Sequence, residues 1–140
     1  MKGQVKALSI PLPPAVIIHD LAQARFALAP KLPVTLLSAP GAGSYLGCLW
    51  WRELLTLADF SGPSLLDCAD APGRALEALK LGLPGIVLTG PAQALPPLAA
   101  IAHGQGARLL TQPPSALNLA QFTAETRLIA WLGGMTGALA

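Results

Sequence analysis

The sequence predicts one α/β domain over residues 1–140, built on an open, mainly parallel sheet of about five strands with helices on both faces. Three observations predict this class. Residues 34–60 read as an apolar strand, a turn of small residues and a long apolar helix, the unit from which α/β domains are built. Similar units recur along the chain. Two long stretches, 32–51 and 81–107, carry no charge, as buried parallel strands do.

The sequence does not determine the order of the strands. A flavodoxin-like or Rossmann-like doubly wound sheet is the main expectation. Five strands are too few to close an eight-stranded barrel within one chain. A half-barrel that a second copy completes stays open as an alternative.

The first half of the chain contains three predicted strands and two helices. Two prolines precede Ala15 and β-branched residues follow it, which favours a first strand over 15–19. Asp20 is a suitable N-cap for a helix over 21–29, which Pro30 ends. The next predicted elements are a strand over 34–38, a helix over 44–60 and a strand over 64–67.

The second half continues the alternation with more proline. Pro72 suits the first turn of a helix over 72–81, and Gly82 suits its end. The remaining predicted elements are strands over 85–89 and 107–111, a helix over 95–102, and short helices over 115–122 and 124–132.

The composition argues against several classes of function. Hydrophobic residues make up 53% and charged residues 11% of the chain, against roughly 25% charged in an average domain. The net charge of +2 comes from scattered lysines and arginines, so no nucleic-acid surface is expected. Pro and Gly interrupt the apolar runs, so no membrane span is expected either. The N-terminal segment does not fit a signal peptide, and the expected location is cytoplasmic. Cys48 and Cys68 fit no disulfide framework or metal motif, and no cofactor is indicated.

The helix expected after the glycines is apolar on most of its surface. Trp50 and Trp51 are adjacent and therefore point about 100° apart, so both cannot face the same layer. We expect a homo-oligomer with this helix at its interface. The alternative is that the C-terminal segment, which carries Trp131 and Met135, covers the helix.

The turn before this helix contains Gly41, Gly43 and Gly47 in the order GxGxxxG. This pattern resembles the dinucleotide-binding fingerprint of Rossmann-type proteins, which implies phosphate contacts to the turn and an acid, here Asp67, on the ribose. The other interpretation is a tight structural turn. We expect Gly41, Gly43 and Ser44 to hold a small anionic ligand.

Polar residues also follow the other strands, and parallel strands bring such residues to one edge of the sheet. Asp67, Asp70 and Thr89 are the further candidate ligand-binding residues at this carboxyl edge. Asp67 is the best catalytic candidate because a carboxylate that ends an apolar strand needs a partner or solvent. Asp20 and Asp70 also fit helix caps.

Two further resemblances concern this edge. Residues 67–90 look like a strand–helix–strand unit of aldolase-like barrels, but no lysine follows a strand to form a Schiff base. Asp20, Asp67 and Thr89 resemble the acids and hydroxyl of response-regulator receiver domains, with Gln112 where receivers carry lysine. This second resemblance implies Asp67 as phosphoacceptor.

Taken together, these features predict a small cytoplasmic binding or assembly protein with an anion site at the carboxyl edge of the sheet. Two alternatives stay open: an enzyme acting on a small phosphorylated or carboxylated metabolite, and a degenerate receiver-like signalling domain. The sequence determines neither the ligand nor the size of the oligomer.

Overall fold

A computed structural model describes residues 11–134, which form one six-stranded sheet whose strand pairs are all parallel. The predicted parallel α/β class is confirmed, with six strands in place of five. The strands are β1 (Ala15–Ile18), β2 (Thr35–Ser38), β3 (Ser64–Asp67), β4 (Gly85–Val87), β5 (Arg108–Leu110) and β6 (Ala116–Asn118). The helices are α2 (Leu21–Leu28), α3 (Ala42–Tyr45), α4 (Cys48–Leu57), α5 (Pro72–Lys80), α6 (Leu95–Gly104) and α7 (Glu125–Leu132), with a 3-10 turn η1 (Ala92–Ala94).

The strand order is β5-β4-β3-β2-β1-β6. Strands β1 to β5 therefore lie side by side in chain order, and β6 returns to pair with the other side of β1. This order differs from the Rossmann-like and flavodoxin-like orders. Because β2 lies between β1 and β3, the acids after these two strands, Asp20 and Asp67, are not on neighbouring strands as they are in a receiver domain.

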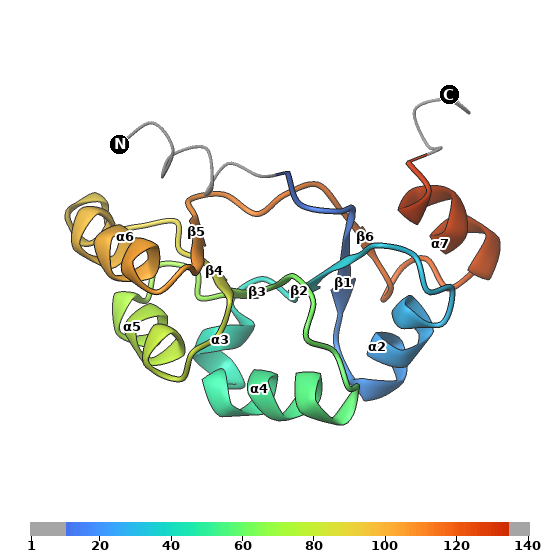
Figure 1. The fold of residues 1–140 in the computed structure, drawn as a ribbon, viewed down its shortest axis with the longest axis horizontal. Coiled ribbons are helices and arrows are strands. Elements are labelled where there is room, and N and C mark those ends of the chain that lie inside the picture. Colours follow the sequence, from blue (N-terminus) through green and yellow to red (C-terminus); the bar gives the residue numbers. More distant parts are fainter. Residues whose placement is uncertain (1–10, 135–140) are drawn as a thin grey trace.

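The sheet is curved like part of a barrel. Residues 111–115 alone connect β5 to β6, the two edges of the sheet. Six Cα–Cα steps span at most about 22 Å, whereas five strand spacings in a flat sheet total about 24 Å. The connection must also return from the carboxyl to the amino end of the sheet, so the two edges must approach each other. Figure 1 shows it crossing the open side of the arc. The curvature matches the half-barrel alternative, and a segment of this chain bridges the two edges.

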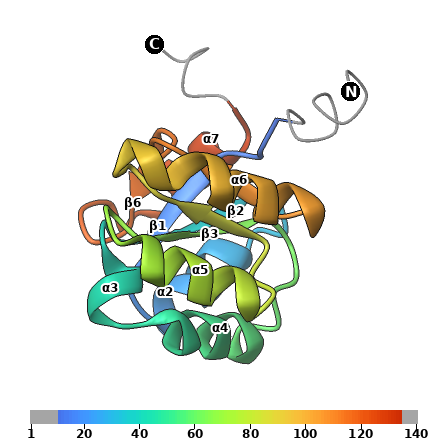
Figure 2. The same ribbon diagram turned by 90° about the vertical axis from the view of Figure 1, so that its left-hand side faces the viewer.

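The helices that contribute to the core pack on one face of the sheet. Leu36, Leu66 and Ile86 share a large cluster with buried residues of α2, α4, α5, α6 and α7. The alternate strand residues Leu37, Leu65 and Val87 form a smaller cluster without any helical residue. Figure 2 shows α4, α5 and α6 side by side along the outside of the curved sheet.

We expected helices on both faces, and the described residues differ from that expectation. The chain moves in one direction from β1 to β5, so right-handed crossovers place each connecting helix on the same side. Extended segments lie on the other face of the sheet. Leu12 and Ala116 pack against the smaller cluster on that face, and the β5–β6 connection crosses the same face (Figure 1).

Two predicted helices were wrong in extent or in kind. The helix expected over 44–60 is divided into α3 and α4 at Gly47, whose φ of 92° is left-handed. The helix expected over 115–122 is instead β6, because Ala116 and Leu117 pair with Ala15 and Val16 of β1. Pairing with a neighbouring strand outweighs weak local preference in such a short segment.

Helix α4 buries one side in the core. Trp51 is fully buried, together with Cys48, Leu54 and Leu55, and its ring centroid lies 5.7 Å from that of the half-buried Trp50. Trp51 therefore belongs to the core and is not available to a partner. Met135, part of the segment expected to cover the helix, lies outside the described residues. Within residues 11–134 no helix is long and apolar enough to cross a membrane.

Candidate functional site

Several of the predicted site residues meet at the carboxyl ends of β2, β3 and β4. Gly43 packs against the end of β3 so closely that a Cβ atom there would lie 3.1 Å from the carbonyl oxygen of Asp67. Gly41 precedes α3 with a φ of 73°. The Thr89 hydroxyl donates to the carbonyl oxygen of Ala69, just after β3, over 3.1 Å. Gly41, Gly43 and Thr89 therefore all lie next to residues 67–69 at the end of β3, while the side chains of Ser44 and Asp70 are exposed.

Asp67 is a buried carboxylate that no Lys or Arg of residues 11–134 pairs with. The residue is only 5% exposed to solvent. Its Oδ1 accepts a hydrogen bond from the Ala69 amide over 2.8 Å, and its own amide donates to Ser38 Oγ over 2.9 Å. Among residues 11–134, no hydrogen bond to Oδ2 and no ion pair with a Lys or Arg is present. The second oxygen is therefore available to a ligand or to water.

The glycine turn itself is largely satisfied by its own backbone. The Ala42 amide donates to the carbonyl oxygen of Ala39, and the Ser44 amide donates to that of Gly41. A phosphate bound here would have to compete with these bonds, because the same N–H groups would hold it. α3 is also a single short turn. The turn therefore fits the structural interpretation well.

Neither cysteine has the environment of a nucleophile. Burial, followed by the charge of Glu77, raises the pKa of Cys48 to about 11, and burial raises the pKa of Cys68 to about 12. Both thiols are therefore protonated at neutral pH, and the thiolate is the reactive form. Cys68 at the carboxyl edge acts as a small buried packing group.

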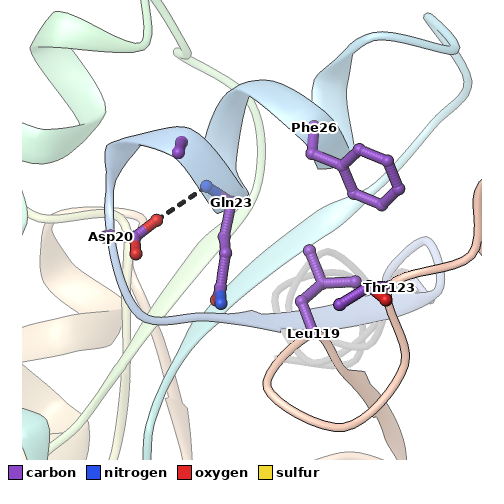
Figure 3. A pocket seen from close by; sticks show the side chains of 6 residues that line it. Asp20, Gln23, Phe26, Leu119 and Thr123 are labelled. Carbon is purple, nitrogen blue, oxygen red and sulfur yellow. Dashed lines mark hydrogen bonds between the residues drawn. The ribbon is translucent and has the colours of Figure 1, made fainter.

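A separate cavity opens between the carboxyl ends of β1 and β6. Its volume is about 240 Å³, and we call it the β1–β6 cavity. Figure 3 shows Phe26 and Leu119 facing each other across it, with Asp20, Gln23 and Thr123 around them. The lining residues are Asp20, Ala22, Gln23, Phe26, Leu119 and Thr123.

The polar groups of the β1–β6 cavity are held by defined hydrogen bonds. Asp20 caps α2, since its Oδ1 accepts from the Gln23 amide over 2.8 Å, which confirms the predicted cap. Gln23 Oε1 accepts from the His19 amide over 2.8 Å and lies 2.9 Å from His19 Nδ1. Because Oε1 can only accept, Nδ1 carries the proton in this contact. Among residues 11–134, Gln23 Nε2 and the second oxygen of Asp20 form no hydrogen bond.

The position of this cavity follows from the strand order. In open α/β sheets, ligands bind outside the carboxyl ends of the strands at the point where the strand order reverses. Here that point lies between β1 and β6. Helix α2 connects β1 to β2, whereas the segment after β6 leads to α7.

Sequence reasoning identified Asp20 as a helix cap and as a receiver-like acid, but it missed this cavity. Its lining comes from segments about 100 positions apart. Their contact depends on β6, whose residues have a helix-like spacing.

The described residues contain no group of three His, Cys, Asp or Glu side chains arranged to hold a metal ion. Comparisons of this chain with models of protein families, with curated proteins and with solved structures find no match.

Proposed function

We propose that this protein binds a small organic molecule in the β1–β6 cavity. The observation that carries the proposal is the coincidence of a real cavity with the reversal of strand order at the carboxyl edge. The volume corresponds to about eight water molecules, slightly below the usual range for ligand pockets. A single-ring compound is the appropriate size.

The lining indicates the chemistry of the ligand. Phe26 and Leu119 offer an apolar contact for the body of the molecule. Asp20 offers a carboxylate oxygen, Gln23 an amide N–H and Thr123 a hydroxyl. Asp20 is the one charged residue in the lining, so a neutral or positively charged ligand is favoured over an anion. The anion predicted from the sequence therefore does not suit this cavity.

Binding of benzylamine and of benzoate, measured by NMR chemical-shift titration, tests this proposal. We expect benzylamine to shift the amides of Gln23, Phe26 and Leu119 saturably, and benzoate to bind more weakly. Ala22→Leu fills the cavity from an exposed helical position and should abolish these shifts. Ala100→Leu, the same change on the exposed side of α6, is the matched control. Equal binding by wild type and Ala22→Leu would overturn the proposal.

Asp20→Asn separates charge from structure. Asn caps helices as well as Asp does, so α2 should keep its stability. A hydrogen bond to a charged group contributes about 1.5–3 kcal/mol, so benzylamine affinity should fall roughly tenfold or more. Unchanged affinity would show that the amine does not reach Asp20.

An enzymatic role at Asp67 is the second candidate. It is supported by the buried carboxylate of Asp67, which forms no ion pair with a Lys or Arg of residues 11–134 and ends the strand against which Gly43 packs. On this hypothesis Asp67 acts as acid or base on a small phosphorylated or carboxylated metabolite. Asp67→Asn should abolish such an activity while leaving the fold intact, because Asn keeps the Oδ1 acceptor. An activity that survives in Asp67→Asn would rule out this role.

Self-association through α3 and α4 is proposed on the exposed apolar residues there. Tyr45, Leu46, Leu49 and Leu57 are between 46% and 64% exposed. In an isologous contact, the α4 helices of the two copies would pack antiparallel. Light scattering should give a dimer, and Leu49→Glu a monomer; a monomeric wild type at all concentrations would refute self-association.

A cytoplasmic location is supported by two free cysteines.

A further inference from the structure

At the amino end of the sheet, opposite to the β1–β6 cavity, lies a second hollow between α4 and the start of β3. Its volume is about 340 Å³. Arg52, Leu55 and Thr56 of α4 form one wall. Residues 60–62, Ser64 and residues 81–84 form the rest. We call it the Ser64 cavity.

Ser64 has a hydroxyl group that the described part of the chain leaves unpaired. The residue is 3% exposed, and its Oγ has no hydrogen-bond partner. It shares its side of β3 with Leu66, which packs toward the helices, and it lines the cavity beside α4. Buried polar groups in native proteins are almost always hydrogen-bonded, so an unpaired one calls for a partner that is not part of the chain.

The charge of the Ser64 cavity is positive. Arg52 is the one charged residue among the lining residues, with no Asp or Glu. Within residues 11–134, the ion pair joins Arg74 and Glu77, and Arg52 forms none. The Thr56 hydroxyl is already used, since it donates to the carbonyl oxygen of Arg52. The Ser61 hydroxyl, like that of Ser64, donates to no described residue.

We propose that the Ser64 cavity is a binding site for a small oxyanion, a carboxylate or phosphate group. Arg52 supplies the charge and the fork of N–H donors that suits such groups. Ser64 Oγ, and Ser61 Oγ at the rim, supply hydroxyl donors. The site is independent of the β1–β6 cavity, whose lining is negative.

The competing explanation is that a buried water molecule satisfies Ser64. The cavity is large enough for water. A water molecule, however, would leave the charge of Arg52 without a counter-charge. The binding of water to Ser64 would also not change when Arg52 is replaced. The two explanations therefore differ in what Arg52→Gln does.

NMR titrations with inorganic phosphate, phenyl phosphate and acetate, at ionic strength matched with sodium chloride, test the proposal. We expect saturable shifts at the amides of Ser61, Gly62 and Ser64 with at least one of these anions and none with chloride. The comparison of phosphates with acetate identifies the group that the site takes. Absence of saturable shifts at these amides for all three anions would overturn the proposal.

Variants then assign the contacts. Arg52 is exposed on α4, so Arg52→Gln should fold normally and weaken binding tenfold or more. Arg25→Gln, an exposed arginine on α2 that does not line this cavity, should bind as wild type. Ser64→Ala should weaken binding several-fold without lowering the Tm, because the hydroxyl has no partner to lose. Equal affinities in wild type and Arg52→Gln, or a large loss of stability in Ser64→Ala, would contradict the assignment.

Discussion

The close approach of β3 and β4 can be tested at Gly85. A Cβ atom at this position would lie 2.6 Å from the carbonyl oxygen of Ser64 and 2.7 Å from Leu65 Cδ2. Real Cβ atoms almost never come so near. The carbonyl oxygen belongs to the neighbouring strand and cannot move without disturbing the ladder. Replacing Gly by Ala in a strand usually stabilises by roughly 0.5–1 kcal/mol, so the geometry predicts a reversal of sign.

We expect Gly85→Ala to lower the free energy of unfolding by about 1–3 kcal/mol, the usual range for overpacking. This corresponds to a fall in Tm on the order of 3–12 °C. Urea denaturation followed by circular dichroism measures the free energy. Gly73→Ala is the matched control: Gly73 lies in the first turn of α5 with nothing within 4 Å of the added atom. This variant should gain roughly 0.5–1 kcal/mol.

The two variants together isolate steric contact from backbone entropy, since both gain the same methyl group. If Gly85→Ala is as stable as wild type or more stable, the two strands do not approach as described. The curvature of the sheet on that side would then be less than the short β5–β6 connection requires.

Three further predictions concern single contacts. Ser38→Ala should cost about 1–3 kcal/mol because it leaves the buried Asp67 amide without its 2.9 Å acceptor; urea denaturation beside Ser64→Ala gives the comparison, and equal stabilities would contradict it. Trp131→Phe should cost about 0.5–1.5 kcal/mol by removing the 2.7 Å bond from Nε1 to the carbonyl oxygen of Ala15, and amide exchange should rise in α7; unchanged exchange there would be evidence against this anchor. The pKa is about 11 for Cys48 and about 12 for Cys68, against 9.0 for an ordinary thiol. Between pH 9.0 and 11 the thiols therefore ionise mainly in the unfolded chain, so the free energy of unfolding should fall as the pH rises through this range. Rapid labelling of the native protein by a thiol reagent at neutral pH would refute this.

The elements with strong local signals were predicted well. Residues 15–18 and 64–67 are strands as expected, because apolar residues between turn-forming residues leave few alternatives. Asp20 caps α2, and Pro72 begins α5, as their chemistry requires. The placement of Gly41, Gly43, Asp67 and Thr89 at the carboxyl edge was also predicted, since it needs only parallel strands.

What depended on tertiary contacts was not predicted. The residues of β6 have the apolar spacing of a helix, and only their pairing with β1 makes them a strand. The break at Gly47, which divides the expected helix into α3 and α4, depends on a left-handed residue that the sequence did not mark. The β1–β6 cavity and the unpaired Ser64 hydroxyl arise from segments distant in sequence, so no local pattern could indicate them.

The return of β6 to β1 has a consequence for synthesis on the ribosome. Strands β1 to β5 can be added one after another, each beside the strand made just before it, through short-range contacts. During that time one side of β1 has no strand beside it, because its partner is residues 116–118. Exposed strand edges pair readily with other chains. A nascent chain that stops before β6 would therefore offer β1 as an open edge, and chaperones that cover such edges would be needed most at that stage.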